Sequence, residues 1–160
     1  MELNDIIGAF AAEVGAAGVV PDDAGAYHLD IDEMTVSFAQ AGGSIVTWAE
    51  VGETPPEGRE RLYRTLMESS LLGKATKGAS FAIDSDSGRI FLQRFDALAA
   101  MTLDGFNAML ESFVNVLEEW RDIIAGFREP ASGQEQEAEG IRELDRGGFM
   151  RVCRVKGLKG

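Results

Sequence analysis

Hydrophobic and polar positions along the chain change their period several times, and each change marks an expected element. Over residues 3–17 apolar side chains recur at helical spacing, which predicts a short amphipathic helix. Over 26–51 apolar and polar residues alternate, which predicts three strands with turns at Asp32-Glu33 and at Ala41-Gly42-Gly43. Because strict alternation buries one strand face and exposes the other, these strands fit an antiparallel meander.

The second half of the chain repeats this change of period. Pro55-Pro56 precedes a predicted helix at about 57–72, since proline suits a helix start. A hairpin is expected over 79–95, and a long helix over about 102–127, where apolar residues recur in steps of three and four. The order is therefore α-β-β-β-α-β-β-α, an α+β fold in which helices pack on a twisted antiparallel sheet.

The last part of the chain differs in composition from residues 1–128, which we expect to form one α+β domain. Residues 129–140 are polar with little apolar content, which predicts a disordered linker. Residues 141–160 form a basic tail with 6 Lys/Arg and 2 Asp/Glu, whereas residues 1–140 hold 9 Lys/Arg and 25 Asp/Glu. An acidic body repels phosphate backbones and anionic lipid, so we expect neither nucleic-acid binding nor membrane insertion for the main domain.

The expected cellular compartment follows from the number of cysteines and from the N-terminal residues of the sequence. Cys153 is the only cysteine, so no disulfide can form within the chain and a reducing compartment fits best. Glu2 and Asp5 stand where a signal peptide carries basic residues, and no apolar run approaches the roughly 20 residues of a membrane span. We therefore expect a cytoplasmic protein.

Candidate chemistry is sparse. His28 is the only histidine and has no second histidine or cysteine nearby in the sequence, which makes a metal site or a general base improbable. The run 84–88 (DSDSG) is one residue short of the calcium loop of an EF-hand and fits a tight turn. Phosphate-binding and nucleophile-elbow motifs are absent. We predict no catalytic residue, metal or cofactor, and no enzyme activity; a chance carboxylate pair in a cleft stays an alternative.

Apolar residues occupy both faces of the predicted strands. Val46 and Trp48 lie on the face opposite Ile45 and Ala49, and Phe91 and Phe95 lie on the face opposite Ile90 and Leu92. Two interpretations remain open from the residues alone. Either the chain covers both faces of the sheet itself, or one face binds a second subunit or another protein.

Residues 71–127 carry a resemblance to a known family. They combine a Leu-Leu helix end, a small-residue linker, a hairpin whose second strand reads RIFLQRF, and a final helix with ESF and EEW. This stretch, with the order of elements over 1–128 and the low isoelectric point, resembles the class I type III secretion chaperones, the Tir-chaperone-like group. The resemblance implies a homodimeric chaperone that does not hydrolyse ATP. It implies that an N-terminal segment of a secreted effector is held extended and delivered to the export machinery.

The resemblance also implies where partners bind. The second helix and the fourth strand carry the dimer contact in that family, which here gives Leu62, Leu66, Leu71, Phe81 and Ile83. Candidates for client binding are chosen by their facing in the predicted strands: Phe38, Trp48, Phe91 and Phe95.

Residues 129–160 depart from the family pattern, which ends near 128. The basic tail has three possible roles: it folds back on the acidic body and occupies the client groove, it binds an acidic partner, or it has no role. The alternative function is a non-enzymatic adaptor or regulatory domain of the same fold that binds a folded protein. A nucleic-acid role confined to the tail is a further alternative.

Overall fold

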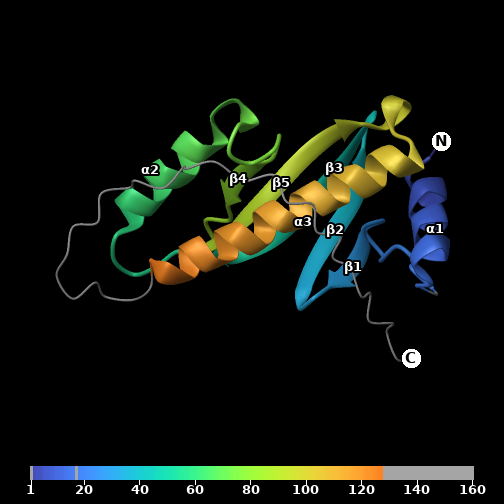
Figure 1. Ribbon diagram of the computed structural model, residues 1–160. Coiled ribbons are helices and arrows are strands. Elements are labelled where there is room, and N and C mark those ends of the chain that lie inside the picture. Colours follow the sequence, from blue (N-terminus) through green and yellow to red (C-terminus); the bar gives the residue numbers. More distant parts are fainter. Residues whose placement is uncertain (1, 17, 128–160) are drawn as a thin grey trace.

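The computed structural model describes residues 2–16 and 18–127 and has the predicted order of elements (Figure 1). The fold class and the order of helices and strands predicted from the sequence are confirmed. The linker and tail predicted at 129–140 and 141–160 lie outside the described residues. The elements are α1 (Leu3–Val14), β1 (Tyr27–Ile31), β2 (Met34–Ala41), β3 (Ser44–Glu53), α2 (Arg59–Ser70), the 3-10 turn η1 (Leu71–Gly73), β4 (Ser80–Ile83), β5 (Arg89–Ala97), the 3-10 turn η2 (Leu98–Ala100) and α3 (Leu103–Gly126).

The five strands form one antiparallel sheet in the order β1-β2-β3-β5-β4. The turn between β1 and β2 is the predicted Asp32-Glu33 pair, and both residues have positive φ (47° and 71°), as a two-residue type I′ hairpin requires. Helix α3 runs across one face of this sheet, with α1 beside its N-terminal half and α2 near β4 (Figure 1). We call the face beneath α3 the core face and the opposite face the outer face.

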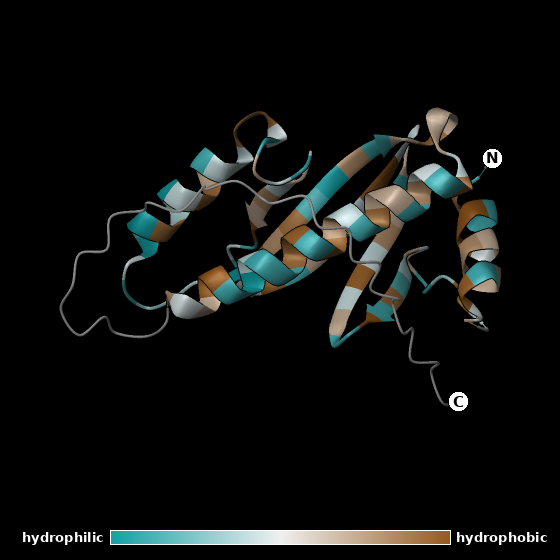
Figure 2. Ribbon diagram, viewed as in Figure 1, coloured by the Kyte–Doolittle hydropathy of each residue, from teal (hydrophilic) through white to brown (hydrophobic). Residues whose placement is uncertain are grey.

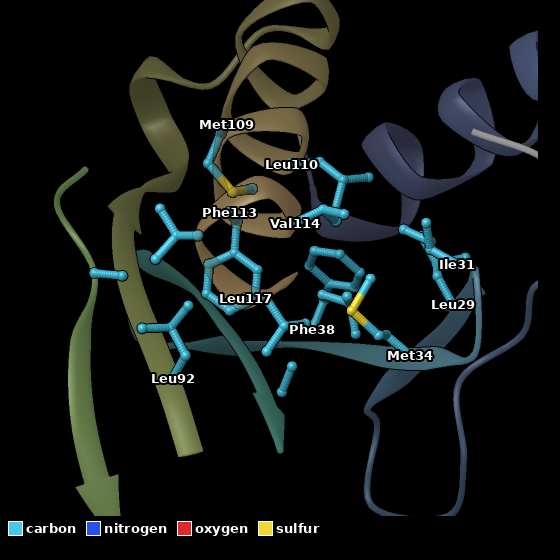
Figure 3. Close-up of a cluster of buried hydrophobic side chains, with 14 of the residues drawn as sticks. Leu29, Ile31, Met34, Phe38, Leu92, Met109, Leu110, Phe113, Val114 and Leu117 are labelled. Atoms are coloured by element: carbon cyan, nitrogen blue, oxygen red, sulfur yellow. The ribbon is translucent and has the colours of Figure 1, made fainter. Parts of the chain in front are cut away.

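The core lies between α3 and the sheet. Phe113 and Leu117 of α3 point toward Phe38 and Leu92 of the sheet (Figure 3), and all four side chains are 2% exposed or less. At the α1 end, the ring of Phe106 lies 5.3 Å from that of Phe38 and 5.5 Å from that of Phe10, measured between ring centroids. Aromatic edge contacts of this kind add to the hydrophobic contribution of burial, so this cluster fixes α1 and α3 on the sheet.

Two local features set where α3 starts and how closely it approaches the sheet. Thr102 is the N-cap of α3, and its Oγ1 accepts a hydrogen bond from the Gly105 amide at 3.1 Å. Near the other end, a β-bulge in β3 brings Gly52 under Ile124, where a Cβ atom on the glycine would lie 2.9 Å from Cγ2. Glycine therefore allows the close packing of α3 on β3.

Within the described ranges, no helix combines the length and the apolar content that a membrane crossing requires.

Candidate protein-binding surfaces

The outer face of the sheet carries an apolar strip on β3 and β5 that Gln93 interrupts. Val46 pairs directly with Phe95, and Trp48 pairs with Gln93 in the same antiparallel ladder. Thr47, which lies between Val46 and Trp48 in the sequence, is buried on the core face, so Val46 and Trp48 point the other way. We call the set Val46, Trp48, Phe91 and Phe95 the outer strip.

The outer strip is open to solvent within the part of the chain that the structure describes. Phe95 is 60% exposed, although an apolar ring on an interior strand is usually covered. Val46, Trp48 and Phe91 are half-buried, which fits side chains that cover one another while the strip as a whole faces solvent. Apolar and polar bands follow one another along β5 (Figure 2), and the consecutive residues Ile90, Phe91 and Leu92 put apolar side chains on both faces of the strand.

Carboxylates lie on the same face of the sheet as the outer strip, one beside it and two on the β1 side. Glu50 lies opposite Phe91 in the ladder and pairs with Arg89 at 3.3 Å. On the β1 side, Asp30 accepts a hydrogen bond from the hydroxyl of Thr35 at 2.7 Å. Asp22 lies 3.0 Å from the Nε2 atom of His28. An apolar strip with carboxylates on the same face suits a partner segment that carries both apolar and basic residues.

Asp22 organises the loop before β1. Its carboxylate contacts His28 and accepts hydrogen bonds from the backbone amides of Ala24 (2.9 Å) and Ala26 (2.8 Å). The His28 hydrogen bond, followed by that of the Ala26 amide, lowers the pKa of Asp22 below its ordinary value of 3.8. The charged form of Asp22 is therefore the one that the folded loop stabilises.

His28 connects this loop to the sheet. Its Nδ1 atom lies 2.8 Å from the Ser37 hydroxyl, which gives a Ser-His-Asp line with Asp22. Ser37 is 6% exposed and lies in β2, which pairs with strands on both sides. Acyl transfer needs hydrogen-bond donors beside the nucleophile for the oxyanion, and strand pairing already uses the backbone amides at this position. We therefore interpret the line as a structural clamp between the loop and the outer face.

A second apolar surface lies between α2 and β4. A groove of about 510 Å³ opens there, and we call it the end groove. Its lining residues are Tyr63, Leu66, Met67, Ser70, Leu71, Leu72, Phe81, Ala82 and Ile83. Four of them are exposed: Met67 by 75%, Leu71 by 68%, Leu72 by 81% and Ile83 by 42%. The turn that follows α2 is hydrophobic in Figure 2, so this apolar surface continues past the helix end.

The loop from η1 to β4 holds Leu71 and Leu72 in this exposed position. Leu72 and Lys77 both have left-handed backbones (φ 56° and 53°), a conformation that costs on the order of 1 kcal/mol for a residue with a side chain. Arg94 compensates by fixing the loop, because its Nη1 atom donates to the Lys77 carbonyl at 2.9 Å. The same guanidinium binds Asp96 through two further bonds of 2.8 Å.

The structure corrects part of the site predicted from the sequence. Phe38 was predicted to bind client, but it is fully buried against Phe106, because its ladder partners Tyr27 and Thr47 lie on the core face. Trp48, Phe91 and Phe95 do lie together on the outer face. That a client binds them stays a prediction.

The predicted dimer residues also separate into two groups. Leu62 and Leu66 face the core of their own subunit, with 0% and 2% exposure, so they hold α2 in place and leave little surface for a second subunit. Leu71, Phe81 and Ile83 line the end groove with larger exposed or half-buried surfaces, whereas Leu66 reaches it only with its buried side. Met67 and Leu72 were missed. Met67 is next to buried Leu66, and only the angle of α2 decides which of the two faces solvent.

No group of three or more His, Cys, Asp or Glu residues is placed to hold a metal ion in residues 2–16 and 18–127. The described surface is thus best characterised by its two apolar areas and by its acidic charge.

Comparison with known proteins agrees with this description. The profile of the Tir chaperone protein (CesT) family matches residues 5–121. The chain belongs to this family. The resemblance to the Tir-chaperone-like group inferred from residues 71–127 is therefore confirmed, and so is the assignment to a family of chaperones.

Solved structures share the fold of this Tir chaperone family member. The ExsC-ExsE complex includes a chain with a TM-score of 0.67 and 22% identity, covering 83% of this chain and 100% of that one. For the HopA1-SchA chaperone-effector complex the TM-score is 0.63 at 13% identity, covering 74% of this chain and 92% of that one. For the type III secretion chaperone SycH of Yersinia pestis, solved with a stable fragment of YscM2, the TM-score is 0.58 at 19% identity. This match covers 72% of this chain and 97% of that one. No curated protein sequence matches the chain significantly.

Proposed function

We propose that this member of the Tir chaperone family is a type III secretion chaperone. It binds an N-terminal segment of an effector or translocated protein, keeps that segment extended for export, and hydrolyses no ATP. The observation that carries the proposal is the outer strip, an open apolar surface on a sheet whose other face packs mainly against the helices. Family membership and the chaperone-effector complexes among its structural relatives support the same function.

The outer strip suits an extended client on energetic grounds. An extended segment loses on the order of 1 kcal/mol of conformational entropy for each residue that becomes ordered. Burial of apolar surface returns about 25 cal/mol per Å², and an aromatic side chain buries about 150–250 Å². Phe91, Phe95 and Trp48 are spaced along two adjacent strands, so they offer successive anchors to an extended client without any nucleotide chemistry.

The end groove is proposed as the dimer contact. Met67, Leu71, Leu72 and Ile83 give it an exposed apolar surface at the β4 edge of the sheet. A second copy of the chain is the occupant that the family resemblance implies, and a twofold contact would cover the same residues in both subunits. We further propose that the dimer acts in the cytoplasm, has no catalytic activity and presents the client to the export machinery.

The alternative is an adaptor domain that binds a folded protein. The two functions differ in the state of the bound partner. An extended client is cleaved readily by protease outside the bound segment and shows little helix or strand content when released. A folded partner stays compact in both the free and the bound state.

Co-purification from the native cell tests the proposed function. We expect the wild-type protein to retain a partner whose protease-resistant segment lies near its N-terminus, and Phe95→Ser to retain at least tenfold less of it. Val20→Ser is the matched control, since Val20 is 72% exposed but lies outside the strip and the groove. A compact, protease-resistant partner, or equal retention by Phe95→Ser, would contradict the proposal.

A further inference from the structure

We propose that residues 141–160 bind the outer strip of their own chain and compete there with the client. The competition rests on the proposed function, whereas the contact between tail and strip does not. The proposal gives the chaperone a built-in competitor that a client must displace.

The outer strip lacks a covering segment in the described part of the chain. Helices α1 and α3 lie on the core face (Figure 1), and Phe95 on the outer face is 60% exposed. Val46 pairs with Phe95 and Trp48 with Gln93 in the ladder, so aromatic residues of two neighbouring strands lie on the same uncovered face. Such a surface is unusual on a monomeric domain and indicates an occupant.

The tail has the chemistry that this surface requires. Residues 141–160 contain 6 Lys/Arg against 2 Asp/Glu, whereas residues 1–127 contain 8 Lys/Arg against 21 Asp/Glu. Around the strip, Asp22, Asp30 and Glu50 contribute carboxylates, and Arg89 contributes a guanidinium. The tail also carries apolar side chains interleaved with its basic ones: Phe149, Met150, Val152, Val155 and Leu158. The apolar side chains of residues 141–160 therefore complement the strip, and their basic side chains complement the carboxylates near it.

The covalent connection permits the contact. Thirteen residues, 128–140, join the described end of the chain to the tail. At about 3.3–3.6 Å per residue they span at most roughly 45 Å, more than the roughly 33 Å length of ten-residue β3. A tether of this length gives an effective concentration of about 1 mM. A tail with a dissociation constant of about 0.1 mM as a free peptide would then occupy the strip about nine-tenths of the time.

The native chain provides its own probe for this contact. Cys153 is the only cysteine and lies in the tail, so a nitroxide can be attached there without any substitution. We expect the label to broaden the backbone amide signals of Val46, Phe91 and Phe95, and to leave those of Met67 and Leu72 in the end groove sharp. Reduction of the nitroxide gives the reference spectrum. This readout needs no client, so it stands even if the proposed function fails.

A mixing experiment separates contact within one chain from contact between chains. Nitroxide-labelled protein without nitrogen-15 is added to nitrogen-15 protein without the nitroxide. Contact within one chain predicts sharp signals in this mixture and broadened signals only when both labels are on the same chain. Broadening in the mixture alone, broadening at the end groove instead of the strip, or no broadening at all would overturn the proposal.

A free peptide of residues 141–160 measures the competition. Trp48 lies half-exposed in the strip and Trp120 is 5% exposed in the core, so peptide binding should change the fluorescence of Trp48; Trp48→Phe should abolish the change. We expect the full chain with Phe149→Ser, Val152→Ser and Val155→Ser to bind the peptide about tenfold more tightly than wild type, because its own tail no longer competes. Serines at Gln134, Gln136 and Ala138 are the matched control. Equal affinity in all three proteins would overturn the proposal.

Discussion

The ring of Phe81 packs edge-on against the indole of Trp120, with centroids 4.8 Å apart and planes at 62°. Phe81 belongs to the edge strand β4 and lines the end groove, whereas Trp120 belongs to α3 and is 5% exposed. The floor of the groove is therefore part of the core packing. A partner that binds in the groove meets a surface that is already ordered, so little entropy is lost in shaping it.

This contact predicts that Phe81 contributes to folding and not only to association. Phe81→Ala removes the ring beside Trp120 and should lower the free energy of unfolding by about 2–4 kcal/mol in urea denaturation. Phe95→Ala is the control, because its ring is 60% exposed and lies opposite Val46 on the outer face. It should cost less than Phe81→Ala, since an exposed ring contributes little beyond the weak contact proposed with the tail. Equal losses in the two variants would contradict the assignment of Phe81 to the core packing.

Leu72 should matter for association and not for folding. It is 81% exposed, so Leu72→Asp leaves the core intact but places a charge in the proposed dimer contact. We expect light scattering to give twice 17.3 kDa for wild type and 17.3 kDa for the variant, with unchanged unfolding of the monomer. Val20→Asp, at a comparably exposed apolar position outside the groove, should stay dimeric. A wild-type protein that is monomeric at all concentrations would exclude the dimer.

The fold could be predicted from the sequence because each helix and strand has a local pattern of apolar and polar residues that indicates its type. The alternation of Tyr27, Leu29 and Ile31 and the 3-4 spacing in α3 fix element type, and Thr102 fixes where α3 begins. The site could be predicted only in part. Strand alternation predicts which residues of one strand share a face, but it does not predict which face of the sheet is buried. Only the register of the ladder shows that Phe38 lies on the core face with Thr47.

The end groove shows that helical spacing, too, predicts only part of a binding surface. The family resemblance put Leu62, Leu66 and Leu71 together in the dimer contact, whereas the structure buries the first two and exposes the third. The reason is that α2 ends at Ser70: Leu71 leaves the helix with a ψ of 114°, and the left-handed Leu72 follows it, so neither residue continues the buried stripe. A positive φ at leucine has no sequence signal, because it is imposed by tertiary contacts.

The clamp at Asp22 predicts a specific dependence of stability on pH. Its pKa is lowered in the folded protein, so the folded state binds its proton less well than the unfolded state does. The resulting stabilisation is present above the ordinary pKa of 3.8 and disappears as the pH falls through the lowered value. We expect wild type to be more stable than Asp22→Asn at pH 6, and the difference to shrink steadily below about pH 4. Urea unfolding of both proteins from pH 2 to 6 measures it. A difference that is independent of pH would rule out the carboxylate charge as its source.

Arg94 should be a positioning residue for the end groove. Its guanidinium makes two bonds to Asp96 and one to the Lys77 carbonyl, and the side chains of the Arg94–Asp96 pair are only 22% and 16% exposed. Arg94→Lys keeps the charge but cannot make this set of bonds in the same geometry. We expect a loss of about 1–2 kcal/mol in unfolding free energy, since charge-assisted hydrogen bonds at part-buried sites contribute this much.

The readout that distinguishes positioning from general destabilisation is local. In Arg94→Lys, amide hydrogen exchange over residues 71–79 should accelerate more than exchange in α3, and the dimer should dissociate at about tenfold higher concentration, because Leu71 and Leu72 are no longer held for the partner. Arg89→Lys is the matched control on the same strand, since its pair with Glu50 is 53% and 43% exposed and should contribute little. If both variants accelerate exchange equally throughout the chain, Arg94 acts on overall stability and has no particular role in shaping the groove.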